Sequence, residues 1–220
     1  LVVKLLHQKK ISFVARGAGT GLSGGAIPNE GSVIIEMARF KKVHEVNIVN
    51  RTITVDPGVV NLRISEYVQD KGYHYAPDPS SQKACTIGGN VAENSGGPHT
   101  LKYGVTVNHV LGVEMVLPDG EIINLGGNHL GMPGPDILGL VIGSEGTFGI
   151  ITKIICRLTP IPERAVTLLG IYKSVKNACE SVSKIIGRGI IPAAMEMLDK
   201  IVVMAVEKTL KPGFPLDAEA

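Results

Sequence analysis

The sequence lacks tryptophan, has only four phenylalanines and five tyrosines, and carries a formal net charge of only +2. Surfaces that stack nucleobases need aromatic side chains, and surfaces that attract nucleic acids or anionic membranes need an excess of positive charge. The composition therefore argues against a nucleic-acid-binding protein and gives no bulk attraction to an acidic membrane.

Cysteine is also scarce, because the chain has only Cys85, Cys156 and Cys179 and no Cys-x-x-Cys pair. An odd number of widely spaced cysteines argues against a disulfide framework and against a zinc ribbon. It favours a reducing compartment, so we expect a cytoplasmic protein that reaches a membrane, if at all, through partner subunits. No apolar run is long enough for a transmembrane segment.

Both ends of the sequence look incomplete. Residues 1–10 resemble the end of a helix that leads into a strand, and residues 214–220 contain no closing element. We therefore expect a fragment of a longer protein, in which the absence of a signal peptide says little about location. With 44% hydrophobic residues, the 220 residues suffice for one core and part of a second.

Glycine, in contrast, is abundant, and it concentrates at residues 15–25, Ala-Arg-Gly-Ala-Gly-Thr-Gly-Leu-Ser-Gly-Gly, after a short β-rich segment. Such a loop can adopt positive φ at several positions, and its N–H groups can converge on an anion. Arg16 adds a planar cation suited to phosphate. We interpret the loop as a diphosphate cradle, and the alternative is a flexible glycine-rich surface turn.

The same loop contains a G-x-G-x-x-G pattern at residues 19–24, and Glu36 ends the next apolar run, as in a Rossmann dinucleotide site. That site needs a helix that begins on the loop. Gly25, Pro28 and Gly31 break any helix there, and the gap to the next strand is too short for a crossover. The sequence also lacks the P-loop pattern G-x-x-x-x-G-K-S/T. We therefore expect a dinucleotide to be held by backbone loops outside a βαβ unit.

The remaining pattern predicts a mixed chain of helices and strands. We expect strands at residues 11–14, 32–36 and 150–158, hairpins at 43–55 and 110–125, and helices at 1–10, 61–71 and 136–142. Residues 159–162, Thr-Pro-Ile-Pro, indicate a boundary. The pattern of apolar residues then changes. It predicts strands at residues 166–172 and 193–197, which alternate with helices at residues 175–186 and 199–208.

A second glycine-rich segment lies in the long irregular stretch 75–103. Two prolines give residues 76–81 a rigid, extended path. Thr86 is suited to cap a short helix that runs through Asn94, and free N–H groups at Gly88-Gly89 would make its N-terminus an anion site. Two such cradles suit a diphosphate held from both sides, and the alternative is a pair of ordinary glycine turns.

These segments resemble a known family. Residues 16–25 are similar to the FAD pyrophosphate loop of the vanillyl-alcohol oxidase/p-cresol methylhydroxylase (PCMH) flavoproteins, and residues 77–81, 86–97, 103–104 and 143–151 match that family in the same order. Within the family, the sequence most resembles the branch of the glycolate oxidase subunit GlcD and the FAD-linked D-lactate dehydrogenases. The resemblance covers nearly the whole chain.

The resemblance implies an α+β fold with two domains. Residues 1–159 would form a two-subdomain PCMH-type FAD-binding domain whose N-terminal part is truncated, and residues 160–220 would begin an α+β cap domain that is incomplete here. Within the FAD-binding domain, residues 1–31 would end the first subdomain and residues 32–158 would hold most of the second.

The resemblance also implies which residues contact the cofactor FAD. They are Arg16, Gly17, Ala18, Gly19, Thr20, Gly21 and Gly24 around the pyrophosphate; Pro77, Asp78, Ser80 and Ser81 on the flavin side; Thr86, Gly88, Gly89, Asn90, Asn94, Gly96 and Gly97 in the second cradle; and Glu145, Gly149, Ile150 and Ile151 near the adenosine or its backbone. Some relatives attach flavin through a histidine at the position of Thr20. Threonine cannot form that bond, so we expect noncovalent FAD.

The implied activity is that of an FAD-dependent oxidoreductase that oxidises a 2-hydroxy acid of the glycolate or D-lactate type by hydride transfer to flavin. The electrons would pass to an acceptor subunit or an electron-transfer protein. The alternative is a non-catalytic FAD-binding or assembly subunit. The family's catalytic and metal-binding histidines follow the region that this chain matches, so we assign no catalytic residue and no metal site within it and expect the chain alone to be inactive.

Other reactive side chains have plainer interpretations. Cys85 lies beside the second cradle without a nearby histidine in the sequence, which favours a packed thiol over a nucleophile. Glu196 either faces a substrate pocket or caps the helix that follows it. Five histidines lack the spacing of metal ligands and are expected to be hydrogen-bonded loop or surface residues, namely His44, His74, His99, His109 and His129.

Overall fold

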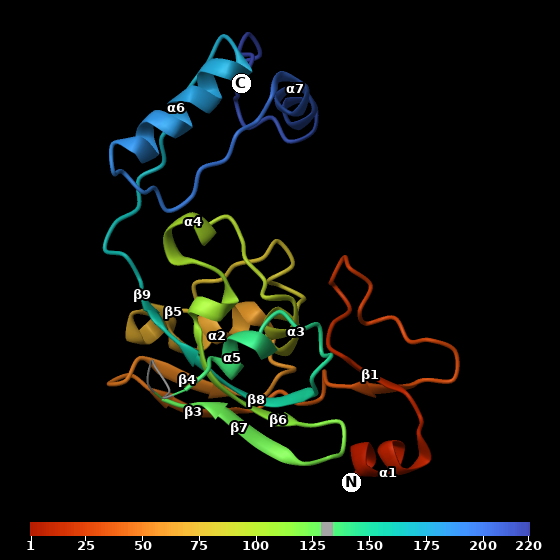
Figure 1. The fold of residues 1–220 in the computed structure, drawn as a ribbon. Helices are drawn as coiled ribbons and strands as arrows, with labels where there is room; N and C mark the ends of the chain where they lie inside the picture. The colour runs from red at the N-terminus through yellow and green to blue at the C-terminus, as the bar shows by residue number, and fades with distance from the viewer. Residues whose placement is uncertain (129–133) are drawn as a thin grey trace. The chain divides into compact units, whose positions relative to one another are not determined.

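The computed structural model describes residues 1–128 and 134–220, so His129 lies outside the described residues. The chain divides into two compact units, Leu1–Ile161 and Pro162–Ala220 (Figure 1). In the described parts of both units, no helix is long and apolar enough to cross a membrane.

The first unit is built on a five-stranded antiparallel sheet with the strand order β3-β4-β8-β6-β7. The strands are β3 (Val43–Asn47), β4 (Thr52–Val55), β6 (Val110–Val116), β7 (Ile122–Gly126) and β8 (Ile150–Arg157). Both predicted hairpins are confirmed. The late strand β8 inserts between them and joins them into one sheet.

Helices cover one face of this sheet, as Figure 1 shows for α2 (Asn61–Val68), α3 (Ile87–Glu93) and α5 (Ile137–Val141). The predicted helix 61–71 forms as α2 followed by a short 3-10 turn, η1 (Gln69–Lys71), and it ends at Gly72, whose φ of 79° favours glycine. The helices and strands share one apolar core, with Ile53, Val55, Ile64, Val68, Ile87, Val91, Ile154 and Cys156 at its centre. This core fixes α3 on the sheet.

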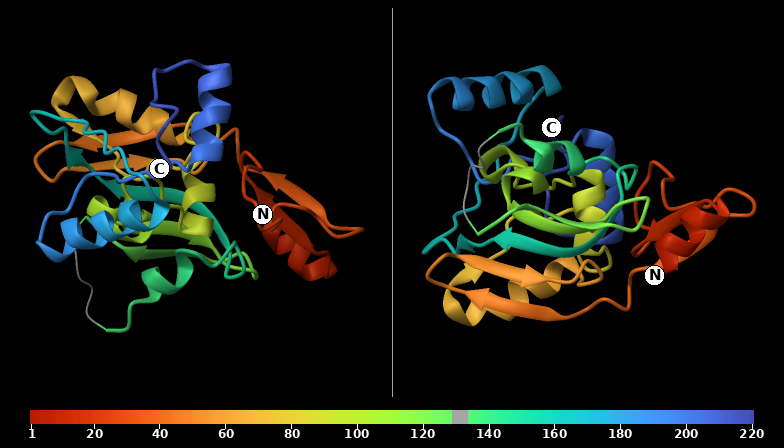
Figure 2. Two further views of the ribbon diagram at one scale, coloured as in Figure 1. Left: turned by 90° about the horizontal axis from the view of Figure 1, so that it is seen from above. Right: turned by 60° about the horizontal axis from the view of Figure 1, so that its bottom comes forward.

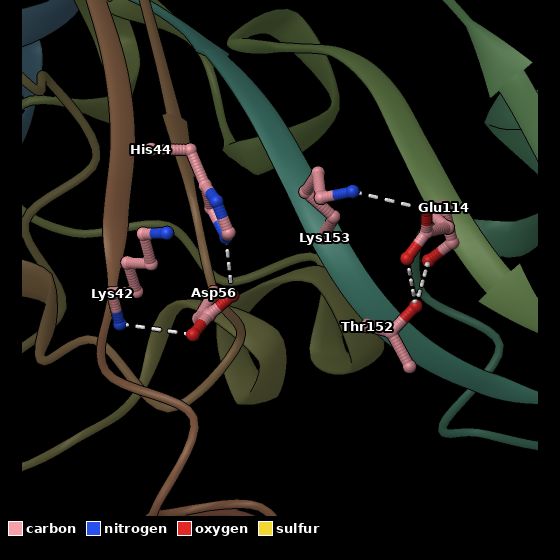
Figure 3. A network of polar contacts seen from close by, with 6 residues as sticks. All are labelled: Lys42, His44, Asp56, Glu114, Thr152 and Lys153. Carbon is pink, nitrogen blue, oxygen red and sulfur yellow. Dashed lines mark hydrogen bonds and ion pairs between the residues drawn. The ribbon is translucent and has the colours of Figure 1, made fainter.

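The opposite face of the sheet carries polar side chains, because successive residues of a strand point to opposite sides. Glu114 lies between buried Val113 and Met115 on β6, and it accepts hydrogen bonds from Lys153 at 3.0 Å and from Thr152 at 2.8 Å (Figure 3). These hydrogen bonds lower the pKa of the Glu114 carboxyl, and the bond from Lys153 contributes most.

At the β3 edge of the sheet, His44 and Asp56 lie 2.6 Å apart, and the backbone N–H of Lys42 donates to Asp56 at 2.9 Å (Figure 3). These contacts tie the start of β3 to Asp56, the residue that follows β4.

A smaller parallel sheet of β1 (Phe13–Arg16) and β2 (Val33–Glu36), with α1 (Val2–Lys9), lies beside the large sheet (Figure 2, in red and orange). No helix forms between β1 and β2, so the exclusion of a Rossmann unit is confirmed. The predicted subdomain division at residues 31 and 32 is wrong, because β2 pairs with β1 rather than with the large sheet.

Four further short elements lie outside the helices and strands that we predicted. The strands β5 (Tyr73–His74) and β9 (Thr159–Pro160) pair with each other, and α4 (Thr100–Tyr103) with the 3-10 turn η2 (Thr106–Asn108) lies within or after the long stretch 75–103. The residues 159–160, predicted as a boundary, are thus held to the first unit by β5.

The second unit contains α6 (Val175–Gly187) and α7 (Lys200–Thr209), which confirms both predicted helices. The strands predicted at 166–172 and 193–197 are wrong, because neither segment finds a neighbouring strand among the described residues, and an unpaired strand is not stable. Asp199, not Glu196, caps α7, since its carboxylate accepts from the Val202 N–H at 2.9 Å. Of the two alternatives for Glu196, the capping of this helix is therefore wrong.

Candidate functional site

The glycine-rich loop begins where β1 ends, and its backbone donors are free of internal partners. Within the part of the chain that the structure describes, the N–H groups of residues 17–23 donate no hydrogen bond to other residues. Gly19 and Gly24 have φ of 67° and 82°, which other residues reach only with strain. A run of unpaired N–H groups must find acceptors in water or in a ligand.

The second segment forms the helix α3 with the predicted caps. The Thr86 hydroxyl accepts from the Gly89 N–H at 3.4 Å, and Asn94 ends the helix in the left-handed region with φ 49°. The prediction of free N–H groups at Gly88 and Gly89 is therefore wrong. Gly89 donates to Thr86, and the N–H groups of Ile87 and Gly88 donate to the carbonyl oxygens of Val59 and Pro57, each at 2.8 Å.

Loop and helix lie directly against each other. A Cβ atom added to Gly17 would stand 2.3 Å from the Thr86 hydroxyl oxygen, and one at Gly21 would stand 2.9 Å from a carboxylate oxygen of Glu93. The Ser23 hydroxyl donates to the same Glu93 carboxylate at 3.1 Å. Glycine is therefore required at residue 17 by the close approach of the two segments that the sequence singled out.

Between these segments lies a cavity of about 560 Å³, within the size range of small-molecule and cofactor sites. Most of the predicted site residues line it, namely Gly17, Ala18, Gly19, Thr20, Gly21, Ser80, Ser81, Thr86, Gly88, Gly89, Asn90, Gly96, Glu145, Gly149, Ile150 and Ile151. Segments that lie more than a hundred residues apart in the chain thus meet around one space.

The other predicted residues do not line the cavity; they are Arg16, Gly24, Pro77, Asp78, Asn94 and Gly97. The Arg16 guanidinium lies beside the loop, 3.4 Å from the position of a Cβ atom on Gly19. Asp78 lies 2.6 Å from the His99 ring, and Asn94 accepts from the Val107 N–H at 2.9 Å. These side chains hold the wall segments in place rather than forming the wall.

Several lining residues were missed by the sequence reasoning, among them Met37, Pro57, Cys85, Glu93 and Ser144. Glu93 carries a usable signal, because it follows Gly89 by one helical turn and therefore lies on the same face of α3. Met37 and Pro57 reach the cavity only through tertiary packing. Cys85 is buried, with its sulfur 3.3 Å from the Asn90 amide nitrogen, as expected of a packed thiol.

The cavity wall contains little charge. Among its described lining residues, Glu93 and Glu145 are the charged ones, and no lysine, arginine or histidine is present. Glu145 adopts φ 53°, an uncommon conformation for a residue with a side chain. An anion in this cavity would be bound by backbone N–H groups.

The histidines stand apart from the cavity. His99 pairs with Asp78, and the ring of His109 is buried with one nitrogen 2.8 Å from the Tyr103 carbonyl oxygen. Burial lowers the pKa values of His74 and His109. In residues 1–128 and 134–220, no group of histidine, cysteine and acidic side chains has the arrangement of a metal site.

Comparison with known protein families identifies the cofactor of the chain. Residues 1–126, more than half of the chain, match the family described as FAD binding domain, and residues 161–220 match the family described as FAD linked oxidases, C-terminal domain. The chain belongs to the FAD-binding domain family of FAD-linked oxidases. FAD is therefore its cofactor.

Relatives of this FAD-linked oxidase chain support the assignment. It is 48% identical over 219 residues to "Glycolate oxidase subunit GlcD" of Escherichia coli (strain K12), covering 100% of this chain and 44% of that protein. It is 43% identical to the protein of that name in Bacillus subtilis (strain 168), covering 100% and 47%. It is 36% identical to "D-lactate dehydrogenase" of Anaerostipes hadrus, covering 99% and 46%. The chain spans less than half the length of these relatives.

Solved structures agree on the fold. The chain superimposes on alkyldihydroxyacetonephosphate synthase with a TM-score of 0.79 and 22% sequence identity, covering 99% of this chain and 42% of that one. The family matches confirm the resemblance to FAD-linked oxidases, and the solved structure confirms the mixed α and β fold class. The cavity also fits FAD, because unpaired N–H groups line one wall and glycine at residue 89 leaves the opposite wall open.

Proposed function

We propose that the protein is an FAD-dependent oxidoreductase that oxidises a 2-hydroxy acid of the glycolate or D-lactate type. The proposal is carried by the cavity between the glycine-rich loop and α3, in a chain similar over its whole length to glycolate oxidase subunits and a D-lactate dehydrogenase. FAD bound there would supply the acceptor for the hydride that leaves the substrate carbon.

In this proposal the chain binds and orients the cofactor. The unpaired N–H groups of residues 17–23 would donate to the pyrophosphate, which suits a wall without lysine or arginine. Arg16, beside the loop, would add longer-range attraction. Ser80 and Ser81 would contact the flavin portion, and Glu145 and Ile150 would contact the adenosine portion. Thr20 in place of a histidine supports noncovalent attachment.

The chain's own cavity does not supply the chemistry of the substrate. Oxidation of a 2-hydroxy acid needs a base within hydrogen-bond reach of the hydroxyl group and a group that binds the carboxylate. The described lining offers no histidine, lysine or arginine for either purpose. We therefore place both groups in the part of the protein that lies outside this chain. Residues 160–220 would begin the cap domain that carries them.

The partners and location follow from the same proposal. Electrons would leave the flavin for an acceptor subunit or an electron-transfer protein, which accords with the names of two relatives as oxidase subunits. The three cysteines are free, two of them buried, and this supports a reducing cytoplasmic setting.

The test is dye-linked oxidation of glycolate and D-lactate, measured after FAD loading with the full-length gene product and with residues 1–220 alone. The full-length protein is expected to oxidise at least one of the two acids, and residues 1–220 are expected to be inactive. Inactivity of the FAD-loaded full-length protein on both acids would contradict the substrate class. Comparable turnover by the shorter chain would contradict the placement of the base.

A second candidate is a non-catalytic FAD-binding or assembly subunit, and the lack of a histidine, lysine or arginine in the described cavity wall favours it for this chain by itself. The two candidates differ in the full-length protein. A flavin-containing protein that turns over a 2-hydroxy acid supports the enzyme, whereas a colourless oligomer supports the assembly subunit.

A further inference from the structure

A buried pair of asparagines lies behind the cavity wall. Asn61, the first residue of α2, is 2% exposed and does not line the cavity, whereas Asn90 on α3 is 3% exposed and does. The Asn61 side-chain NH₂ group donates to the Pro77 carbonyl oxygen at 3.0 Å and to the Asn90 side-chain oxygen at 2.9 Å. A buried amide with these partners costs stability if either bond is lost.

These bonds fix which way the Asn90 amide points. The Pro77 carbonyl oxygen can only accept, so the Asn61 atom that faces it must be the NH₂ group. The same NH₂ group faces Asn90, which must therefore present its oxygen to Asn61. The Asn90 NH₂ group is left on the other side, 3.3 Å from both the Cys85 sulfur and the Ser95 hydroxyl.

Cys85 and Ser95 both line the cavity, so the Asn90 NH₂ group lies at the cavity wall, where the Cys85 sulfur and the Ser95 hydroxyl accept its two N–H groups. A wall with two carboxylates and no cation gains from the positive end of an amide dipole beside an anionic cofactor. An Asn90 amide turned the opposite way would present an oxygen there and repel it.

We propose that Asn61 is a positioning residue, which holds the Asn90 amide with its NH₂ group, the positive end of the amide dipole, at the cavity wall and so favours the anionic FAD. The inference rests on the proposed FAD site. It resembles the way in which outer residues orient the ligands of metal sites, where the partner of a ligand decides which atom faces the site.

The test is to replace Asn61 by the isosteric aspartate in the full-length protein. FAD affinity is measured by quenching of flavin fluorescence on titration with apo-protein. Burial raises the pKa of the introduced carboxyl above that of a free aspartate, so the change is measured at about pH 7.5 and at about pH 5.5, of which the lower favours the protonated form. The ionised carboxylate can only accept hydrogen bonds, so the Asn90 amide has to turn its NH₂ group toward residue 61. The protonated carboxyl can donate to the Asn90 oxygen, as the asparagine side chain does. We expect FAD binding about tenfold weaker than wild type at the higher pH, with most of the affinity restored at the lower pH.

Three comparisons make the result decisive. Asn124→Asp, the same change at an exposed position of β7, should leave the affinity at the wild-type value at both pH values. In an Asn90→Ala background, Asn61→Asp should have no further effect, because the group that it turns is gone. Should Asn61→Asp fail to fold, Asn61→Ala, which adds no charge, is expected to weaken FAD binding at both pH values.

The positioning role would be overturned if both Asn61 variants bound FAD as tightly as wild type. It would also be overturned if Asn61→Asp lowered the FAD affinity by the same factor in the Asn90→Ala background as in wild type. Either result would leave the FAD site standing. A wild-type protein that binds no FAD would overturn the FAD site and this inference together.

Discussion

Gly88 and Gly89 are neighbours on α3, but a side chain would meet different surroundings at each. A Cβ atom on Gly88 would stand 2.6 Å from the Pro57 ring, so glycine there permits α3 to pack on the turn after β4. On Gly89 it would meet only the Thr86 hydroxyl oxygen, at an ordinary 3.5 Å, and would project toward the cavity. Gly88 therefore serves packing, and Gly89 keeps the cavity open.

Thr20 leads us to expect noncovalent flavin. It lines the cavity, but its side chain cannot form the covalent flavin bond that a histidine forms, and the described cavity wall contains no histidine. We expect acid or heat precipitation of the holoprotein to release the flavin into the supernatant. A washed pellet that stays yellow would contradict noncovalent binding.

His109 makes the stability of the first unit depend on pH. Its ring is 1% exposed, and one ring nitrogen, Nδ1, has no partner among the described residues. Its pKa is lowered, chiefly by burial, so the unfolded chain takes up a proton more readily than the folded one. The stabilisation is complete above the pKa of an unfolded histidine, about 6.5, and is lost as the pH falls below it.

Urea unfolding of the apo-protein at a series of pH values tests this expectation. The free energy of unfolding should fall between about pH 7 and about pH 5, and His109→Gln should make that decline shallower. A part of the decline in the free energy of unfolding should remain in His109→Gln, because burial also lowers the pKa of His74. An unchanged slope in His109→Gln would show that His109 is not its source.

At the scale of elements, the glycine loop and α3 are coupled through the contact of Gly17 with Thr86. Gly17→Ala places a methyl group 2.3 Å from the Thr86 hydroxyl oxygen, and Thr86→Ala removes that oxygen and the N-cap of α3. Each single change should destabilise the protein, by about 1 kcal/mol for the lost cap and by about 1–3 kcal/mol for the overpacking.

The double variant distinguishes a local contact from two separate effects. Removal of the oxygen makes room for the new methyl group, since the next Thr86 atom, its Cβ, lies 3.5 Å away. Gly17→Ala/Thr86→Ala should therefore be more stable than the sum of the two losses predicts, as measured by thermal unfolding. Strict additivity would mean that loop and helix do not touch in solution.

The elements also show what the sequence could predict. Thr86 and Asn94 carry local capping chemistry, so the bounds of α3 follow from the sequence, as do the hairpins and α2. The acceptors of the Ile87 and Gly88 N–H groups lie on residues 57 and 59, and no local pattern reveals such a distant contact. The apolar run 166–172 has strand composition, but a strand needs a partner, and its composition cannot say whether one is present.

For the whole molecule, the family resemblance predicted which segments gather around the cavity, and the structure brings most of them together. It did not separate residues that line the cavity from those that support it. Pro77, Asp78 and Asn94 belong to the same motifs as their lining neighbours, and only the course of the backbone distinguishes them. Asn61 lies outside every motif and is found only by following hydrogen bonds.

The central claim is that FAD lies between the glycine loop and α3, and FAD retention by Gly89→Val in equilibrium dialysis tests it most directly. The fold has room for the Cβ atom, but the branched side chain enters the cavity. The matched control is Gly187→Val at the end of α6, where a Cβ atom meets nothing within 4 Å. We expect Gly89→Val to bind FAD at least about tenfold more weakly than wild type, while Gly187→Val binds it as wild type does. Equal retention of FAD by both variants would contradict this location of the cofactor.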